Sequence, residues 1–118
     1  MTKEELRDRA AHDLGKIRLD GSLQHQDKVR IEQGYDEVYD ALEEEGLATW
    51  PIDGPIPNNV VKYVSGLVAL NCALTYSLSQ ERLAAIYSVV GPDGELGMKM
   101  IQFHVIPEQE STSDLMYV

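Results

Sequence analysis

Apolar residues near the start of the chain recur every four positions, which predicts a helix with one buried face. Leu6, Ala10 and Leu14 form this stripe. Thr2 and Glu5 stand three residues apart at its beginning, which is the spacing of a capping box at a helix N-terminus. The first helix should therefore begin after Thr2 and end near residue 15.

From about residue 26 to residue 45 the pattern predicts a longer amphipathic helix. Ile31, Tyr35, Val38 and Leu42 form its apolar stripe, and most of its carboxylates lie off that stripe. The helix should therefore present an acidic outer face. Its candidate functional residues are Glu37, Asp40, Glu43 and Glu44. Two interpretations stay open: a solvated surface, or a patch that awaits a basic partner or lines a pore.

The segment from Val60 to Leu74 is the most apolar part of the chain and predicts a central helix, because its apolar residues cover too wide an arc for a surface helix. Pro51, Pro55 and Pro57 stiffen the connector before it, since each proline fixes its own φ and favours an extended residue before it. Pro57 also suits a first helical turn, so the helix should begin there. We expect Trp50 to cover the open end of the core.

A fourth helix is predicted from about Ser79 to Val89, with Ile86 and Tyr87 on its apolar stripe. The turn residues Gly91 to Gly94 should end it. The segment that follows, ELGMKMIQF, is compatible with a short helix and with an extended conformation. The predicted core joins Leu6, Ala10, Leu14, Tyr35, Val38, Leu42, Val64, Leu67, Val68 and Ile86.

These elements predict an all-α fold, a four-helix bundle-like domain over residues 1–106 with a central apolar helix. Residues 107–118 have neither helical nor strand periodicity and predict an extended C-terminal arm. The arm is polar up to an apolar tip, which consists of Leu115, Met116, Tyr117 and Val118. A tip of this kind would be exposed in a lone monomer. It should either dock on another protein or fold back onto its own bundle.

The charge balance restricts the partners that the chain can bind. It has 20 acidic and 10 basic residues and a formal net charge of −10. A surface that grips nucleic acid must be basic, so this balance argues against such a role. An acidic surface can still let DNA pass without sticking, because it repels phosphates. Charge alone does not separate that role from simple solubility.

The remaining residue types point to a soluble protein without catalytic machinery. The single cysteine, Cys72, lies in the apolar segment and should be buried and unreactive. The charged N-terminus shows no secretion signal, and polar residues interrupt the apolar segment, as in a core helix rather than a membrane span. His12, His25 and His104 stand singly, and no phosphate loop or nucleophile elbow is present. We therefore expect no cofactor, no metal site and no catalytic residue.

Several segments together resemble the head–tail adaptor family of tailed bacteriophages. The likeness begins with EELRDRAAHDLGKI, whose first helix ends in Leu14-Gly15, and continues through Tyr35-Asp36 and the LATW that closes the second helix. It then includes the step from prolines to an apolar helix in IPNNVVKYVSGLVALNCA. The likeness spans roughly residues 1–90, and the chain departs from it after Val90, where GPDG interrupts the long fourth helix of the relatives.

The resemblance implies a structural role. It implies a helical bundle that forms a ring, usually of twelve copies, beneath the portal protein at the head–tail junction of the virion, after synthesis in the host cytoplasm. Such a ring extends the DNA channel, helps retain packaged DNA and offers a platform to the next tail protein. Leu115, Met116, Tyr117 and Val118 would then dock on the portal. The acidic face of the second helix would line the channel or a subunit boundary, with DNA as cargo and no membrane contact.

Two other functions compete with this one. The chain could be an acidic helical interaction module that occupies the site of a basic partner. It could also cleave peptidoglycan with a pair of carboxylates, although almost any acidic helix meets that description. Each function predicts a different feature. The connector should form a ring with a portal, the interaction module should be a monomer or dimer with one basic partner, and the enzyme should have a cleft with two close carboxylates.

Overall fold

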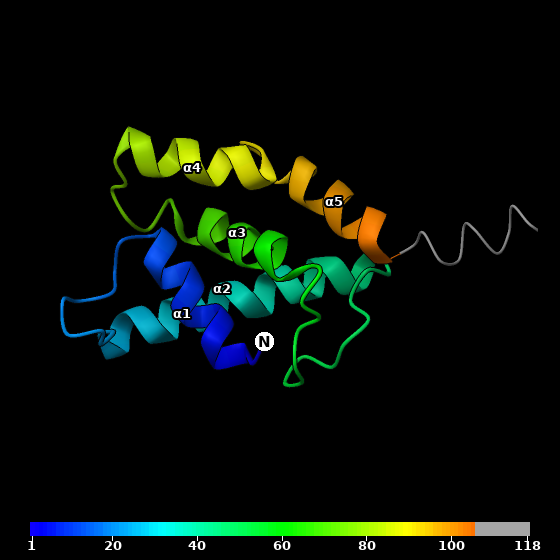
Figure 1. The fold of residues 1–118 in the computed structure, drawn as a ribbon, viewed down its shortest axis with the longest axis horizontal. Coiled ribbons are helices and arrows are strands. Elements are labelled where there is room, and N and C mark those ends of the chain that lie inside the picture. The colour runs from blue at the N-terminus through cyan, green and yellow to red at the C-terminus, as the bar shows by residue number, and fades with distance from the viewer. Residues whose placement is uncertain (106–118) are drawn as a thin grey trace, which may run out of the picture.

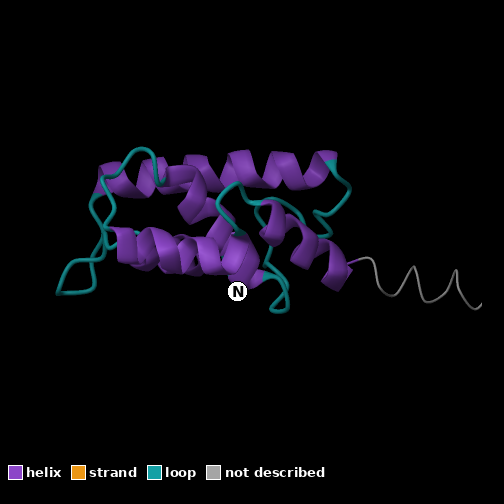
Figure 2. Ribbon diagram, turned by 90° about the horizontal axis from the view of Figure 1, so that it is seen from above, coloured by secondary structure: helices purple, strands orange, loops and turns teal. Residues whose placement is uncertain are grey.

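The computed structural model describes residues 1–105, and this part of the chain consists of five helices joined by loops (Figure 1). The helices are α1 (Lys3–Asp13), α2 (His25–Glu44), α3 (Val61–Cys72), α4 (Gln80–Val90) and α5 (Glu95–Val105). A view turned by 90° shows helices and no strand among these residues (Figure 2). The prediction of an all-α, bundle-like fold is confirmed, and the segment after the GPDG turn is helical.

The predicted arm, residues 107–118, lies outside the described residues. Its tip of Leu115, Met116, Tyr117 and Val118 therefore stays a prediction. Within residues 1–105, no helix is long and apolar enough to span a membrane.

The third helix is the centre of the fold, as predicted. α3 packs against α1, α2, α4 and α5, and Figure 1 shows it between α4 above and α2 below. Gly66 permits the close approach of α4, because a Cβ there would lie only 2.7 Å from Cγ1 of Val90. The small and apolar composition of α3 thus lets neighbouring helices pack on several of its sides.

All ten predicted core residues are buried. Trp50 is buried too, and its indole nitrogen Nε1 donates a hydrogen bond to Oη of Tyr35 at 3.1 Å. Oη of Tyr39 donates to the carbonyl of Trp50 at 2.6 Å, and Oη of Tyr35 donates to the carbonyl of Ile52 at 3.1 Å. These bonds fix the proline-rich connector against α2 and satisfy polar atoms that burial would otherwise leave unpaired.

The predicted limits of the third helix are wrong at both ends. Pro57 does not begin the helix but opens a separate turn, in which the N–H of Val60 donates to the carbonyl of Pro57 at 3.1 Å. α3 ends at Cys72, so Leu74 lies outside it and its side chain is 99% exposed. At this end, Arg30 of α2 donates from Nη2 to the carbonyl of Asn71, which gives a terminal carbonyl a cationic partner.

Candidate functional site

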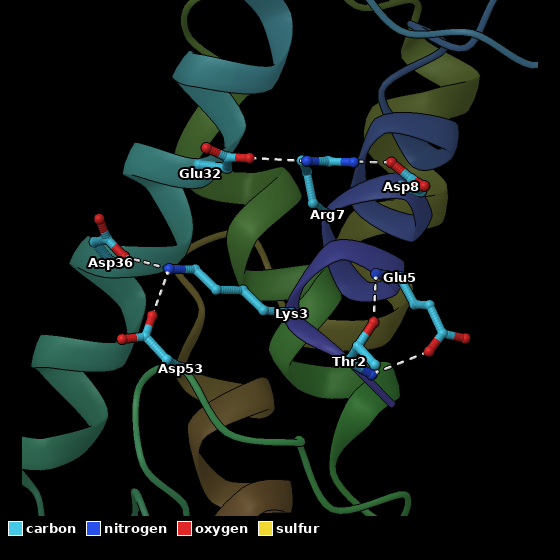
Figure 3. Close-up of polar contacts among 8 residues, drawn as sticks. All are labelled: Thr2, Lys3, Glu5, Arg7, Asp8, Glu32, Asp36 and Asp53. Carbon is cyan, nitrogen blue, oxygen red and sulfur yellow. Dashed lines mark hydrogen bonds and ion pairs between the residues drawn. The ribbon is translucent and has the colours of Figure 1, made fainter.

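Apart from Asp27, which accepts a hydrogen bond from Tyr76, the acidic residues of α2 form two groups, and the first group is bound to α1 (Figure 3). Nη1 of Arg7 lies 2.8 Å from Oε1 of Glu32, and Nζ of Lys3 lies 3.7 Å from Oδ1 of Asp36 and 3.1 Å from Oδ1 of Asp53. Burial disfavours the charge of Lys3, but the hydrogen bond to Asp53 and the two nearby carboxylates outweigh it and raise its pKa. These carboxylates hold α1 and the connector on α2.

The second group contains the four residues predicted from the sequence, and all of them are exposed. Oε2 of Glu37 accepts a hydrogen bond from the amide of Asn71 at 2.8 Å. Within residues 1–105, Asp40, Glu43 and Glu44 have no cation at ion-pair distance. Glu43 and Glu44 also stand at the negative end of the helix dipole, and the last turn of α2 contains no basic residue. This end of α2 is therefore a source of uncompensated negative charge.

A groove of about 350 Å³ lies beside this acidic face, between α2, α3 and the start of α5. Its floor is apolar and consists of Val38, Ala41, Leu67, Leu70 and Met98. Its rim carries three carboxylates, those of Glu37, Asp93 and Glu95, and no lysine or arginine lines it. We call this feature the acidic groove. Of the four predicted residues, Glu37 lies on it, whereas Asp40, Glu43 and Glu44 do not line it.

Glu37 is held in place by a chain of polar side chains that crosses from α3 back to α2. The amide nitrogen of Asn71 donates to Glu37, and the amide oxygen accepts from Nη2 of Arg30 at 3.3 Å. Nε of Arg30 donates to Oγ1 of Thr75 at 2.9 Å. Because each partner is oriented by the next, the rim carboxylate of Glu37 is already restricted. It therefore loses less conformational entropy on ligand binding than a freely rotating surface carboxylate would.

Two buried residues, Gly34 of α2 and Cys72 of α3, lie where these helices contact each other. A Cβ on Gly34 would lie 2.8 Å from Sγ of Cys72 and 3.1 Å from the amide oxygen of Asn71, so only glycine lets α2 and α3 approach this closely here. Cys72 is buried, as predicted. Burial raises the pKa of its thiol, although the charge of Arg30 opposes the shift. The thiol is therefore protonated at neutral pH and serves as a packing group.

A second depression of about 410 Å³ continues the acidic groove past Leu70 and Asp93, which line both. Its other walls are mostly apolar and include Leu74 and Tyr87, and both of these side chains are exposed. The prediction that Tyr87 belongs to a buried stripe is therefore wrong. An apolar strip thus extends beyond the acidic groove, and among the described residues Asp93, which lines both depressions, is the one carboxylate on the second.

The histidines do not add a metal centre to this surface. Among the residues that the structure describes, no group of three or more His, Cys, Asp or Glu side chains is placed to hold a metal ion. The ring of His104 instead stacks on Tyr63, with 5.9 Å between the ring centroids.

Sequence patterns did not reveal the other half of the groove. Asp93 belongs to the turn at Gly91–Gly94, which the sequence identifies only as a helix breaker, and Glu95 begins α5. Both line the groove with Glu37 because α4 and α5 pack on α3. The one available signal was the placement of two carboxylates around a glycine turn, which many solvent loops share. Comparisons of the chain with protein-family models, with curated proteins and with solved structures gave no match.

Proposed function

We propose that the chain is a structural head–tail connector of a tailed phage, which forms a ring under the portal protein and has no catalytic activity. In this role it extends the DNA channel, helps retain packaged DNA and provides an attachment site for tail proteins. The observation that carries the proposal is the acidic groove, an apolar surface with a negative rim that suits a protein partner. The likeness across residues 1–90 supplies the phage context.

The geometry supports two separate tasks. An apolar side chain of a partner can fill the floor of the acidic groove, and anchors of this kind contribute about 2 kcal/mol or more to binding. A lysine or arginine beside the anchor can then pair with the carboxylates of the rim. Asp40, Glu43 and Glu44 lie outside the groove and repel phosphates, so they suit a channel through which DNA slides.

The tip at Leu115, Met116, Tyr117 and Val118 is assigned to the portal in this proposal. The partners of the whole chain in this proposal are the portal, the next tail protein and further copies of the chain. Its location is the head–tail junction of the virion. The tip and the groove then bind different partners. The tip docks on the portal, and the groove receives a neighbouring copy or a tail protein.

Electron microscopy of the chain mixed with its candidate portal tests the proposal. We expect rings of the chain on the portal, and loss of those rings or of DNA passage when Glu43→Lys and Glu44→Lys are combined. The fold should survive, because cations at this end of α2 match the helix dipole. Glu81→Lys, an exposed reversal on α4, is the matched control and should assemble normally. A chain that stays monomeric and does not bind the portal would refute the connector role.

A second function, an acidic module for one basic partner, is favoured by the same three carboxylates around the groove. It predicts a monomer or dimer that binds a basic apolar peptide with strong salt dependence. Titration of such a peptide into the wild type and into Glu37→Gln distinguishes the two functions. Tight, stoichiometric binding without portal-dependent ring formation would support the module.

A further inference from the structure

A third depression, a cavity of about 300 Å³, lies between α1, α3 and α4. No residue of α2 lines it, and no residue of α1 lines the acidic groove. On α3, Lys62 and Ser65 face this cavity, whereas Leu67 and Asn71 face the groove. At 100° per residue these two pairs point in different directions. The cavity and the groove therefore open on different sides of the central helix.

The charges of this cavity are opposite to those of the groove. Arg9 and Lys62 line it, and within residues 1–105 neither has a carboxylate at ion-pair distance. Asp13 also lines it and offsets one of the two cations. Arg82 lies nearby but is engaged, since Nη1 donates to the carbonyls of His12 and Asp13. Ile86 and Val89 supply an apolar wall. We call this feature the cationic pocket.

The chain leaves α5 close to this pocket. His104, in the last turn of α5, stacks on Tyr63, and Tyr63 is the neighbour of Lys62 in α3. Asp114 follows Val105 by nine positions, and an extended chain of that length reaches about 30 Å. The contact between His104 and Tyr63 is far shorter than this reach, so residue 114 can arrive at Lys62 without any change in the helices.

The segment after residue 105 matches the cationic pocket and not the acidic groove. It contains Glu108, Glu110 and Asp114 and no lysine or arginine, and apolar residues follow Asp114 directly. Three carboxylates on the rim of the groove repel this segment, while Arg9 and Lys62 attract it. Charge therefore favours the cationic pocket over the acidic groove, two depressions of similar size.

We propose that the acidic and apolar end of the same chain occupies the cationic pocket, with Asp114 against Arg9 and Lys62 and with Leu115 and Met116 against Ile86 and Val89. This inference goes beyond the connector role, because it concerns the free chain and needs no portal. A short tether gives an effective concentration of about 1 mM, so a contact with an intrinsic dissociation constant near 0.1 mM would be closed about ten-elevenths of the time. A portal would then compete with the pocket for the tip.

Paired cysteines in the full-length chain test this contact. Met116→Cys is combined with Ser88→Cys in the cationic pocket or, as the matched control, with Ala41→Cys in the acidic groove, and both partner positions are exposed on helices. In a glutathione buffer we expect a disulfide within one chain to form at least tenfold faster for the Ser88 pair. Arg9→Glu with Lys62→Glu should abolish the difference, and Asp114→Lys added to that variant should restore it.

Equal rates for the two pairs would show that the tip samples both depressions without preference, which would overturn the proposal. Disulfide-linked dimers, formed faster at higher concentration, would overturn the assignment within one chain in favour of the tip of a second copy. If the Ser88→Cys variant does not fold, amide NMR spectra of the full chain decide. Asp114→Lys should shift the signals of Ser65 and Val89 and leave Ala41 unchanged, and an unchanged Val89 would refute the contact.

Discussion

The free energy of unfolding of the Leu67→Ala variant tests two features at once, the central position of α3 and the openness of the acidic groove. Leu67 is 8% exposed and forms part of the floor of the acidic groove, whereas Leu42 of α2 is fully buried. Truncation of either leucine removes the equivalent of about three methylene groups, about 2.4 kcal/mol at ~0.8 kcal/mol each. The sealed site at Leu42 should also retain a cavity, which adds to the loss of stability. At Leu67 the new space opens to the groove and fills with water.

We therefore expect a loss of about 2–3 kcal/mol in the free energy of unfolding for Leu67→Ala and of about 3–5 kcal/mol for Leu42→Ala. Urea denaturation followed by circular dichroism measures both, with an unchanged m-value as the sign that only stability has changed. A loss below about 0.5 kcal/mol for Leu67→Ala would show that α3 is not central. A loss for Leu67→Ala as large as that for Leu42→Ala would show that its site is sealed rather than open to the groove.

Three further predictions concern stability. Gly34→Ala should lower the urea midpoint. Overpacking against Cys72 costs about 1–3 kcal/mol, which outweighs the ~1 kcal/mol gain in helix propensity. A higher midpoint would contradict the close contact between α2 and α3. Thr2→Ala should lose about 1 kcal/mol with the cap of α1, while Thr2→Ser should not. Burial and the hydrogen bond to Asp27 raise the pKa of Tyr76, so stability should be full below about pH 10 and fall above it. Tyr76→Phe should reduce that slope in melts between pH 8 and 11.

The sequence predicted the helices better than their ends, and α3 shows why. Its apolar arc follows from residue types alone, so its central place could be inferred from composition and period. At its last turn, Arg30, 41 residues away in the sequence, donates a hydrogen bond to the carbonyl of Asn71. No local pattern carries such a contact. The same holds for α5, which could be helix or strand by period.

The conformation of α5 is instead explained by packing. A Cβ on Gly97 would lie 2.7 Å from Cγ1 of Val90 and 3.1 Å from Cδ2 of Leu67, so the helix passes close to α4 and α3 at that glycine. Glycine weakens a helix by about 1 kcal/mol relative to alanine, but Glu95, Leu96 and Met98 beside it are good helix formers, so local propensity is compatible with the observed helix. The packing at Gly97 places α5 against α3 and α4, and Asp93 and Glu95 at the start of that helix line the groove.

The candidate site follows from how the fold distributes its few cations. Four of the ten basic residues have polar partners inside the described fold, namely Lys3, Arg7, Arg30 and Arg82. Two of these neutralise the α1 side of α2, which leaves the far end of that helix and the acidic groove without positive charge. Arg9 and Lys62 face another side of α3, where they line the cationic pocket. Because the two depressions differ in charge and are similar in size, a basic partner and the acidic end of the chain would be directed to different sides of the same central helix.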